Sequence, residues 1–337
     1  MQTRGILAGG NWIVDHVKLL DRWPPQDGLA QILARSAGNG GGPYNVLKDL
    51  AKLGAPFPLE AVGLLGDDAD GRAIRADTAA HGIDATQLHV TNAAPTSFTD
   101  VMTVRATGRR TFFHAPGANA LLAPEHFDFA QTRARHFHLA YLLLLDALDA
   151  PGPDGLPRSV EVLRRARAAG LRTSIDCVSA RPEQFATLVA PALPETDVLF
   201  ANDFETEQLT GIDLGRGATL QRAAVERAAR DLIARGVRDW ALIHFPEGVC
   251  AASSRGELIW QPAVRMPASE IVGTAGAGDA LAAGVLCGRL QDWPMPRCLE
   301  LGVGTAAASL RDGTCSNAVL PAADCLALGR RHGFLAA

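Results

Sequence analysis

The chain has 337 residues, of which 47% are hydrophobic and 20% charged, and its formal net charge at pH 7 is -4. This length supports a large core, in one large domain or two smaller ones, and the composition excludes an extensively disordered protein. The 32 basic and 36 acidic residues form no long run of one sign. No nucleic-acid or membrane-surface footprint is therefore expected, and small molecules are the favoured partners.

The most apolar stretch, residues 139–145, is far too short to cross a bilayer, and residues 1–16 have no signal-peptide pattern. We therefore expect a cytoplasmic protein. The six cysteines form no CxxC pair, so we expect reduced, mostly buried thiols. His136 and His138 lie on one face of a predicted strand, and without a third ligand in view we expect them to be structural.

Short apolar strands alternate with helical patterns along the chain, which predicts an α/β fold with a mostly parallel sheet covered on both faces. Strands are predicted over residues 5–8, 61–65, 136–144, 173–176, 198–201 and 240–244. Helical patterns include residues 159–170 and 220–236. Several helices are predicted to end at a glycine, namely Gly54, Gly82, Gly170 and Gly236.

Residues 96–114 depart from this alternation of strands and helices. Their polar and apolar residues alternate as in a two-stranded hairpin with its turn at Thr107-Gly108. The β-rich stretch 12–20 is a candidate partner, and together the two segments could form a small lid. Arg109 and Arg110 in the hairpin could meet a phosphorylated or acidic substrate, although exposed arginines at a turn are more often solvated.

Residues 273–284, "GTAGAGDALAAG", predict a glycine-rich turn that enters a helix near Asp279. The Walker A loop is excluded, because none of the three lysines follows a glycine. The dinucleotide motif GxGxxG is incomplete as well. First-turn amides and glycines instead suit a phosphate, and the helix field would keep Asp279 ionised as a base for phosphoryl transfer. In the alternative interpretation, Gly276 and Gly278 only permit tight packing and Asp279 caps the helix.

Further motifs follow one another along nearly the whole chain. They are "GNWIVD" (10–15), "GGGPYNVLKDLAKLG" (40–54), "VGLLGDDADG" (62–71), "HGID" (81–84), "PGAN" (116–119), "SID" (174–176), "NDFETEQLTG" (202–211) and "GAGDALAAGVL" (276–286). In this order they resemble the ribokinase-like (PfkB) family of sugar and nucleoside kinases. The resemblance implies one domain over residues 1–337, a three-layer sandwich with a mostly parallel central sheet and a small β lid built from about 12–38 and 95–115.

The expected acceptor site combines side chains and glycines near the first strand. Asn11 and Asp15 are placed at the C-terminal end of that strand, where an amide and a carboxylate suit a polyol. Gly40 and Gly41 would let the backbone approach the same ligand, and Asn45 can bond to it from the next helix. The alternative for residues 40–42 is a flexible surface turn.

The expected donor site lies at later strand ends and at the glycine-rich turn. Asn202 and Glu205 would share a helical face and order waters bound to Mg²⁺, or else form an N-cap with an ordinary first-turn acid. The other nucleotide-binding candidates are Phe245, Gly248, Thr274, Gly276 and Gly278. Phe245 stands where the family usually has a glycine, and we expect it to crowd the donor. Gly273 replaces an acid that the resemblance associates with a monovalent cation, which leaves that cation doubtful.

The resemblance implies a cytoplasmic carbohydrate kinase that transfers the γ-phosphoryl group of ATP, with Mg²⁺, to a hydroxyl of a sugar. Asp279 is the expected general base, and the backbone amides of Gly276, Ala277 and Gly278 form the expected anion hole. Exposed lid edges favour a homodimer through the lid. A nucleoside kinase of the adenosine type and a non-catalytic sugar or nucleoside sensor remain as alternatives.

Overall fold

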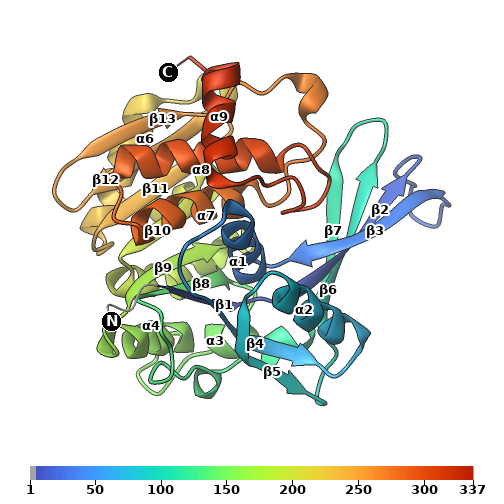
Figure 1. Ribbon diagram of the computed structural model, residues 1–337, viewed down its shortest axis with the longest axis horizontal. Helices are drawn as coiled ribbons and strands as arrows, with labels where there is room; N and C mark the ends of the chain where they lie inside the picture. Colours follow the sequence, from blue (N-terminus) through green and yellow to red (C-terminus); the bar gives the residue numbers. More distant parts are fainter. Residues whose placement is uncertain (1–4, 337) are drawn as a thin grey trace.

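A sheet with the strand order β13-β12-β11-β10-β9-β8-β1-β4-β5 runs through the centre of the molecule (Figure 1). This computed structural model describes residues 5–336. Neighbouring strands from β5 to β11 are parallel, whereas β12 and β13 are antiparallel additions at one edge. The strands are β1 (Ile6–Gly10), β4 (Leu59–Gly66), β5 (Asp84–Thr91), β8 (His136–Leu142), β9 (Arg172–Cys177), β10 (Val198–Asn202), β11 (Trp240–Phe245), β12 (Gly248–Ser253) and β13 (Leu258–Pro262). The predicted strands and the mostly parallel sheet are confirmed.

Helices cover both faces of this sheet, which explains why β1 and β4 consist entirely of buried residues. One hydrophobic cluster joins the sheet to α1 (Gly42–Leu53), α2 (Ala69–Ala80), α7 (Ala277–Leu290), α8 (Met295–Ser309) and α9 (Ala322–His332). A second cluster joins the other face to α3 (Asp146–Asp149), α4 (Arg158–Ala168), α5 (Asp203–Thr210) and α6 (Arg222–Ala234). The two clusters and the sheet between them give the three predicted layers.

A second, smaller sheet extends from the side of this body (Figure 1). Its strands, in the order β3-β2-β6-β7, are β2 (Ile13–Leu20), β3 (Ile32–Gly40), β6 (Ser97–Val104) and β7 (Arg110–Ala115). The strands β6 and β7 form the predicted hairpin, and Gly108 adopts a positive φ of 66° in its turn. The predicted partner stretch is also confirmed, because β2 pairs with β6 in parallel.

The small sheet enters the body through three buried glycines, Gly40, Gly41 and Gly42, at the junction of β3 and α1. Gly41 adopts a φ of 84°, and a Cβ there would collide with the carbonyl oxygen of Asn11. A Cβ at Gly40 would collide with the Asp15 carboxylate. The surface-turn alternative for this segment is therefore wrong, because the glycines allow the backbone to pack closely.

The cysteines and the paired histidines are structural, as expected. All six cysteines are free and buried. His136 and His138 are buried and both contact the hydroxyl of Ser174, at 2.7 and 2.8 Å. Within residues 5–336, no helix has both the length and the apolar character needed to cross a membrane.

The packing of α1 generates a stability prediction with a matched control. Leu47 of α1 is fully buried, whereas Leu121 is 42% exposed. Leu47→Ala should lower the free energy of unfolding by about 2–5 kcal/mol, because it leaves a cavity in the core. Leu121→Ala should change it by less than about 1 kcal/mol. Urea unfolding followed by circular dichroism measures both variants, and equal effects would contradict the position of α1 in the core.

Candidate active site

The glycine-rich turn leads into α7 and places Asp279 in the first turn of this helix. This helix begins at Ala277, with Gly276 as its N-cap at a φ of 73°. The predicted start near Asp279 was therefore too late. The difference matters, because Ala277 and Gly278 now belong to the first turn, where amides point along the helix axis toward any anion at the N-terminus.

The Asp279 carboxylate is buried between groups from two other elements. Tyr141 of β8 donates its hydroxyl to the two carboxylate oxygens at 2.7 and 2.6 Å, and the Asn45 side-chain amide of α1 donates at 2.8 Å. Burial raises the Asp279 pKa to about 6, although both hydrogen bonds act in the opposite direction. At pH 7 a carboxyl group with this pKa is still mostly ionised, but desolvation brings its pKa closer to neutrality than the helix field suggested.

Asn11 lies at the end of β1 as predicted, whereas Asp15 does not. Asn11 follows β1 and is fully buried, and its side chain bonds to the backbone of Tyr141 and Leu144. It therefore ties β1 to the end of β8. Asp15 is not at the end of the first strand but within β2, on the small sheet. Burial and the charge of Asp279 raise the Asp15 pKa to about 7.

A hydrogen-bonded chain links the small sheet to Asp279. Asn39, at the end of β3, donates to the side-chain oxygen of Asn45 at 2.7 Å and to the Ser316 hydroxyl at 2.9 Å. Asn45 in turn donates to Asp279. Sequence reasoning missed Asn39 and Ser316. Ser316 lies far along the chain from the motifs, so spacing gives no signal for it.

Most of the predicted nucleotide-binding residues line one pocket of about 520 Å³ on the other side of the turn. They are Asn202, Phe245, Gly248, Thr274 and Gly278, and Ala277 lies beside them. Glu205 and Gly276 are not in this lining. The other lining side chains are mainly apolar and come from α7, α8 and the 263–271 segment, including Val264, Leu281, Val303 and Ala307.

The sequence analysis also missed His244, which lies in the wall of this pocket beside Gly278. Burial lowers the His244 pKa to about 4, so the imidazole is neutral at pH 7. The neighbouring Phe245 packs edge-on against Trp260, with ring centroids 5.8 Å apart. This contact holds the Phe245 ring at the pocket wall.

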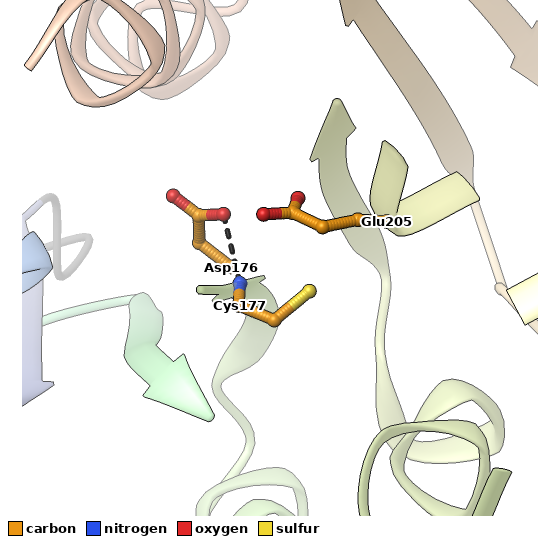
Figure 2. A group of neighbouring side chains, drawn as sticks. All are labelled: Asp176, Cys177 and Glu205. Atoms are coloured by element: carbon orange, nitrogen blue, oxygen red, sulfur yellow. Dashed lines mark hydrogen bonds between the residues drawn. The ribbon is translucent and has the colours of Figure 1, made fainter. Parts of the chain in front are cut away.

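Asn202 and Glu205 form a capping box rather than sharing a helical face. Asn202 precedes α5 as its N-cap and accepts from the Glu205 amide at 2.9 Å, while Glu205 accepts from the Asn202 amide at 3.0 Å. The N-cap alternative is therefore confirmed for Asn202. Glu205 is more than an ordinary first-turn acid, however, because its carboxylate is buried and faces Asp176 (Figure 2).

Figure 2 shows Asp176, Cys177 and Glu205 gathered where β9 ends beside α5. One potential ligand atom from each residue lies within 4.8 Å of the others. Burial raises the Glu205 pKa to about 7, and burial together with the Glu205 charge raises that of Asp176. Two close carboxylates that disfavour each other's charge are suited to a cation.

Comparison with known proteins decides the family. The pfkB family carbohydrate kinase profile matches residues 10–323. The chain belongs to the PfkB family. It is therefore a sugar or nucleoside kinase of that family, and the predicted resemblance is confirmed. The match includes the small sheet as well as the glycine-rich turn.

Curated PfkB relatives act on different acceptors. The chain is 29% identical over 323 residues to the ATP-dependent ribose-1-phosphate kinase of Halopiger xanaduensis, covering 96% of each protein. It is 27% identical over 250 residues to the aminoimidazole riboside kinase of Salmonella typhimurium, covering 73% of this chain and 72% of the relative.

Solved structures confirm the fold. The Arabidopsis thaliana ribokinase complexed with ribose and ATP superposes with a TM-score of 0.76 at 20% identity, covering 96% of this chain and 98% of the other. The Thermotoga maritima ribokinase gives 0.78 at 18% identity, covering 97% and 99%. The predicted ribokinase-like architecture of a large sheet with a second small sheet is thus confirmed.

Proposed function

We propose that this PfkB kinase transfers the γ-phosphoryl group of ATP to a hydroxyl of a sugar, with Asp279 as general base. The observation that carries this proposal is the position of residues 274–279 between two cavities. Thr274, Ala277 and Gly278 line the 520 Å³ pocket. Ala275 lines a small cavity that it shares with Asp15 under the small sheet. The turn thus stands between a donor side and an acceptor side, with a buried carboxylate behind it.

In the proposed reaction, the acceptor oxygen attacks the γ-phosphorus of ATP and forms a new P–O bond. The bond from that phosphorus to the β–γ bridging oxygen breaks, and ADP leaves with the electron pair. The acceptor proton passes to the Asp279 carboxylate. The amides of Gly276, Ala277 and Gly278 stabilise the charge on the phosphoryl oxygens, with the positive end of α7 behind them.

The donor side has features that suit a nucleotide and its metal ion. The apolar walls from α7 and α8 suit a flat base, while Asn202 and Thr274 mark the polar end. Asn202 and Glu205, with Asp176 beside them, would hold Mg²⁺ through water. Bound there, Mg²⁺ would neutralise phosphate charge. Phe245 and Gly248 would border the nucleotide.

The acceptor side would lie under the small sheet, which we propose acts as a lid over a domain spanning residues 1–337. Asp15, Gly40, Gly41 and Asn45 would contact the acceptor, while Asn11 would support them by fixing the strand ends. Tyr141 must release one Asp279 oxygen when an acceptor hydroxyl arrives, because its own hydroxyl contacts both oxygens.

A coupled ADP-release assay across pentoses, hexoses, keto-sugar acids and nucleosides tests the function. We expect turnover with at least one sugar, and Asp279→Asn should lower kcat by about 10²- to 10⁴-fold, because the base is lost. The acceptor KM should change little. A variant that keeps most of its activity would remove Asp279 from the base role. Binding of a sugar without binding of any nucleotide in calorimetry would instead identify a sensor, and turnover confined to nucleosides a nucleoside kinase.

Tyr141→Phe tests how the Tyr141 hydrogen bond affects the pKa of the proposed base, Asp279. A base whose pKa is about 6 must lose its proton before it acts, so kcat should fall as pH decreases through about 6. The Tyr141 hydroxyl favours the carboxylate form, so its removal should raise the Asp279 pKa and move this acid limb to higher pH. A pH profile of kcat from 5 to 9 measures the shift. An unchanged acid limb would mean that another group sets it.

We also propose that the small sheet mediates a homodimer. It carries exposed apolar side chains, among them Trp23 (49% exposed), Phe112 (59%) and Phe113 (52%), and β3 and β7 are its open edges. Phe113→Glu should therefore weaken a dimer seen by sedimentation velocity. Val90→Glu is the matched control, because Val90 is similarly exposed (48%) on β5 of the other sheet. A wild-type protein that is monomeric at micromolar concentration would contradict the proposal.

A further inference from the structure

Arg110 of the small sheet faces the proposed acceptor cavity rather than solvent. The strand register pairs Asp15 with Thr99 and Thr99 with His114, while Arg110 pairs with Thr103. Because alternate residues of a strand share a face, Arg110 lies on the same face of the small sheet as Asp15. Both side chains line the cavity that includes Asn39, Ala275 and Cys315.

The guanidinium of Arg110 crosses from the small sheet to the body, where it lies against Gly273. A Cβ at position 273 would collide with the Arg110 Nη2 atom. Gly273 has no positive φ that would require a glycine for its backbone. A Cβ there would also approach the backbone oxygen of Asp312 at 3.0 Å, so the space beside Gly273 is limited by the guanidinium and by the backbone of Asp312. An acid at this position, as in the usual family motif, would displace or neutralise Arg110.

The charge of Arg110 is not balanced by a contact partner. Within residues 5–336, its guanidinium has no hydrogen bond or ion pair. It is the only cationic side chain among the described residues that line this cavity. Asp15 is near enough for the Arg110 charge to lower its pKa, but the two groups form no ion pair. A partly buried guanidinium with free donors is suited to a planar or tetrahedral oxyanion.

We propose that Arg110 binds an anionic group of the acceptor, so that the preferred substrate is a sugar phosphate or sugar acid rather than a neutral sugar. This inference rests on the proposed kinase function. Asp15 would face the hydroxyls of such an acceptor, and Arg110 would hold its anionic end. Gly273 leaves the guanidinium free to do so.

The test compares ribose with ribose 1-phosphate, ribose 5-phosphate and ribonate, in wild type, Arg110→Ala and Arg109→Ala. Wild type should prefer at least one anionic acceptor in kcat/KM by about 10- to 100-fold, and Arg110→Ala should lose that preference mainly through KM. The quantity compared between variants is the ratio of kcat/KM for the anionic acceptor to kcat/KM for neutral ribose. The exposed neighbour Arg109 is the matched control and should have no effect on the preference.

Gly273→Asp provides a second variant with a different chemical change. The new carboxylate would lie against Arg110, so it should reduce the preference for anionic acceptors as Arg110→Ala does. Gly273→Ala separates the steric part of this effect from its charge. If Gly273→Asp leaves the preference intact, the proposed link between the two residues is wrong.

Calorimetry without nucleotide separates this inference from the kinase proposal. Tighter binding of an anionic acceptor to wild type, lost in Arg110→Ala, would support the anion site even if no acceptor is phosphorylated. Turnover of neutral sugars with no preference for anionic ones would overturn the anion site and leave the kinase intact. If Arg110→Ala lowers kcat equally for neutral and anionic acceptors, Arg110 acts on the transferred phosphoryl group, and the inference is wrong.

Discussion

The burial of one carboxylate constrains three elements of this fold. Asp279 on α7 is only 3% exposed, and its side chain is held by one donor from α1 and one from β8. A buried charge that loses a donor becomes costly, so the hydrogen bonds from Asn45 and Tyr141 favour the charged form. The packing of α1 against α7 therefore places the Asn45 donor beside Asp279 as well as forming part of the core.

Much of the fold could be predicted from the sequence, because its signals are local. The parallel strands are short apolar runs, and β6 of the hairpin alternates between buried and partly buried residues as a half-buried strand does. Gly54 ends α1 in the left-handed conformation that its position implied. The family motifs added the order of the elements. The roles of Asp279 and of the amides before it stay predictions until they are measured.

The incorrect or missing predictions concern residues whose position or pKa is set by tertiary contacts. Asp15 was assigned to the end of β1, although the chain turns at Asn11 and starts a new strand in another sheet. Burial then raised the pKa values of Asp15 and Asp279, which no spacing reveals. Asn39 could not be found either, because its importance comes from contacts with α1 and with the distant Ser316.

The junction at Gly40–Gly42 connects the small sheet rigidly to the body. Strand β3 continues into α1 through glycines whose close packing leaves no slack. If the small sheet moves as the proposed lid, this close packing would transmit the movement to α1. Because Asn39 and Asn45 lie on either side of this junction and are bonded to each other, that motion would reach the Asp279 carboxylate directly. In the proposed function, closure of the small sheet would therefore be coupled to the hydrogen bonding of the Asp279 carboxylate.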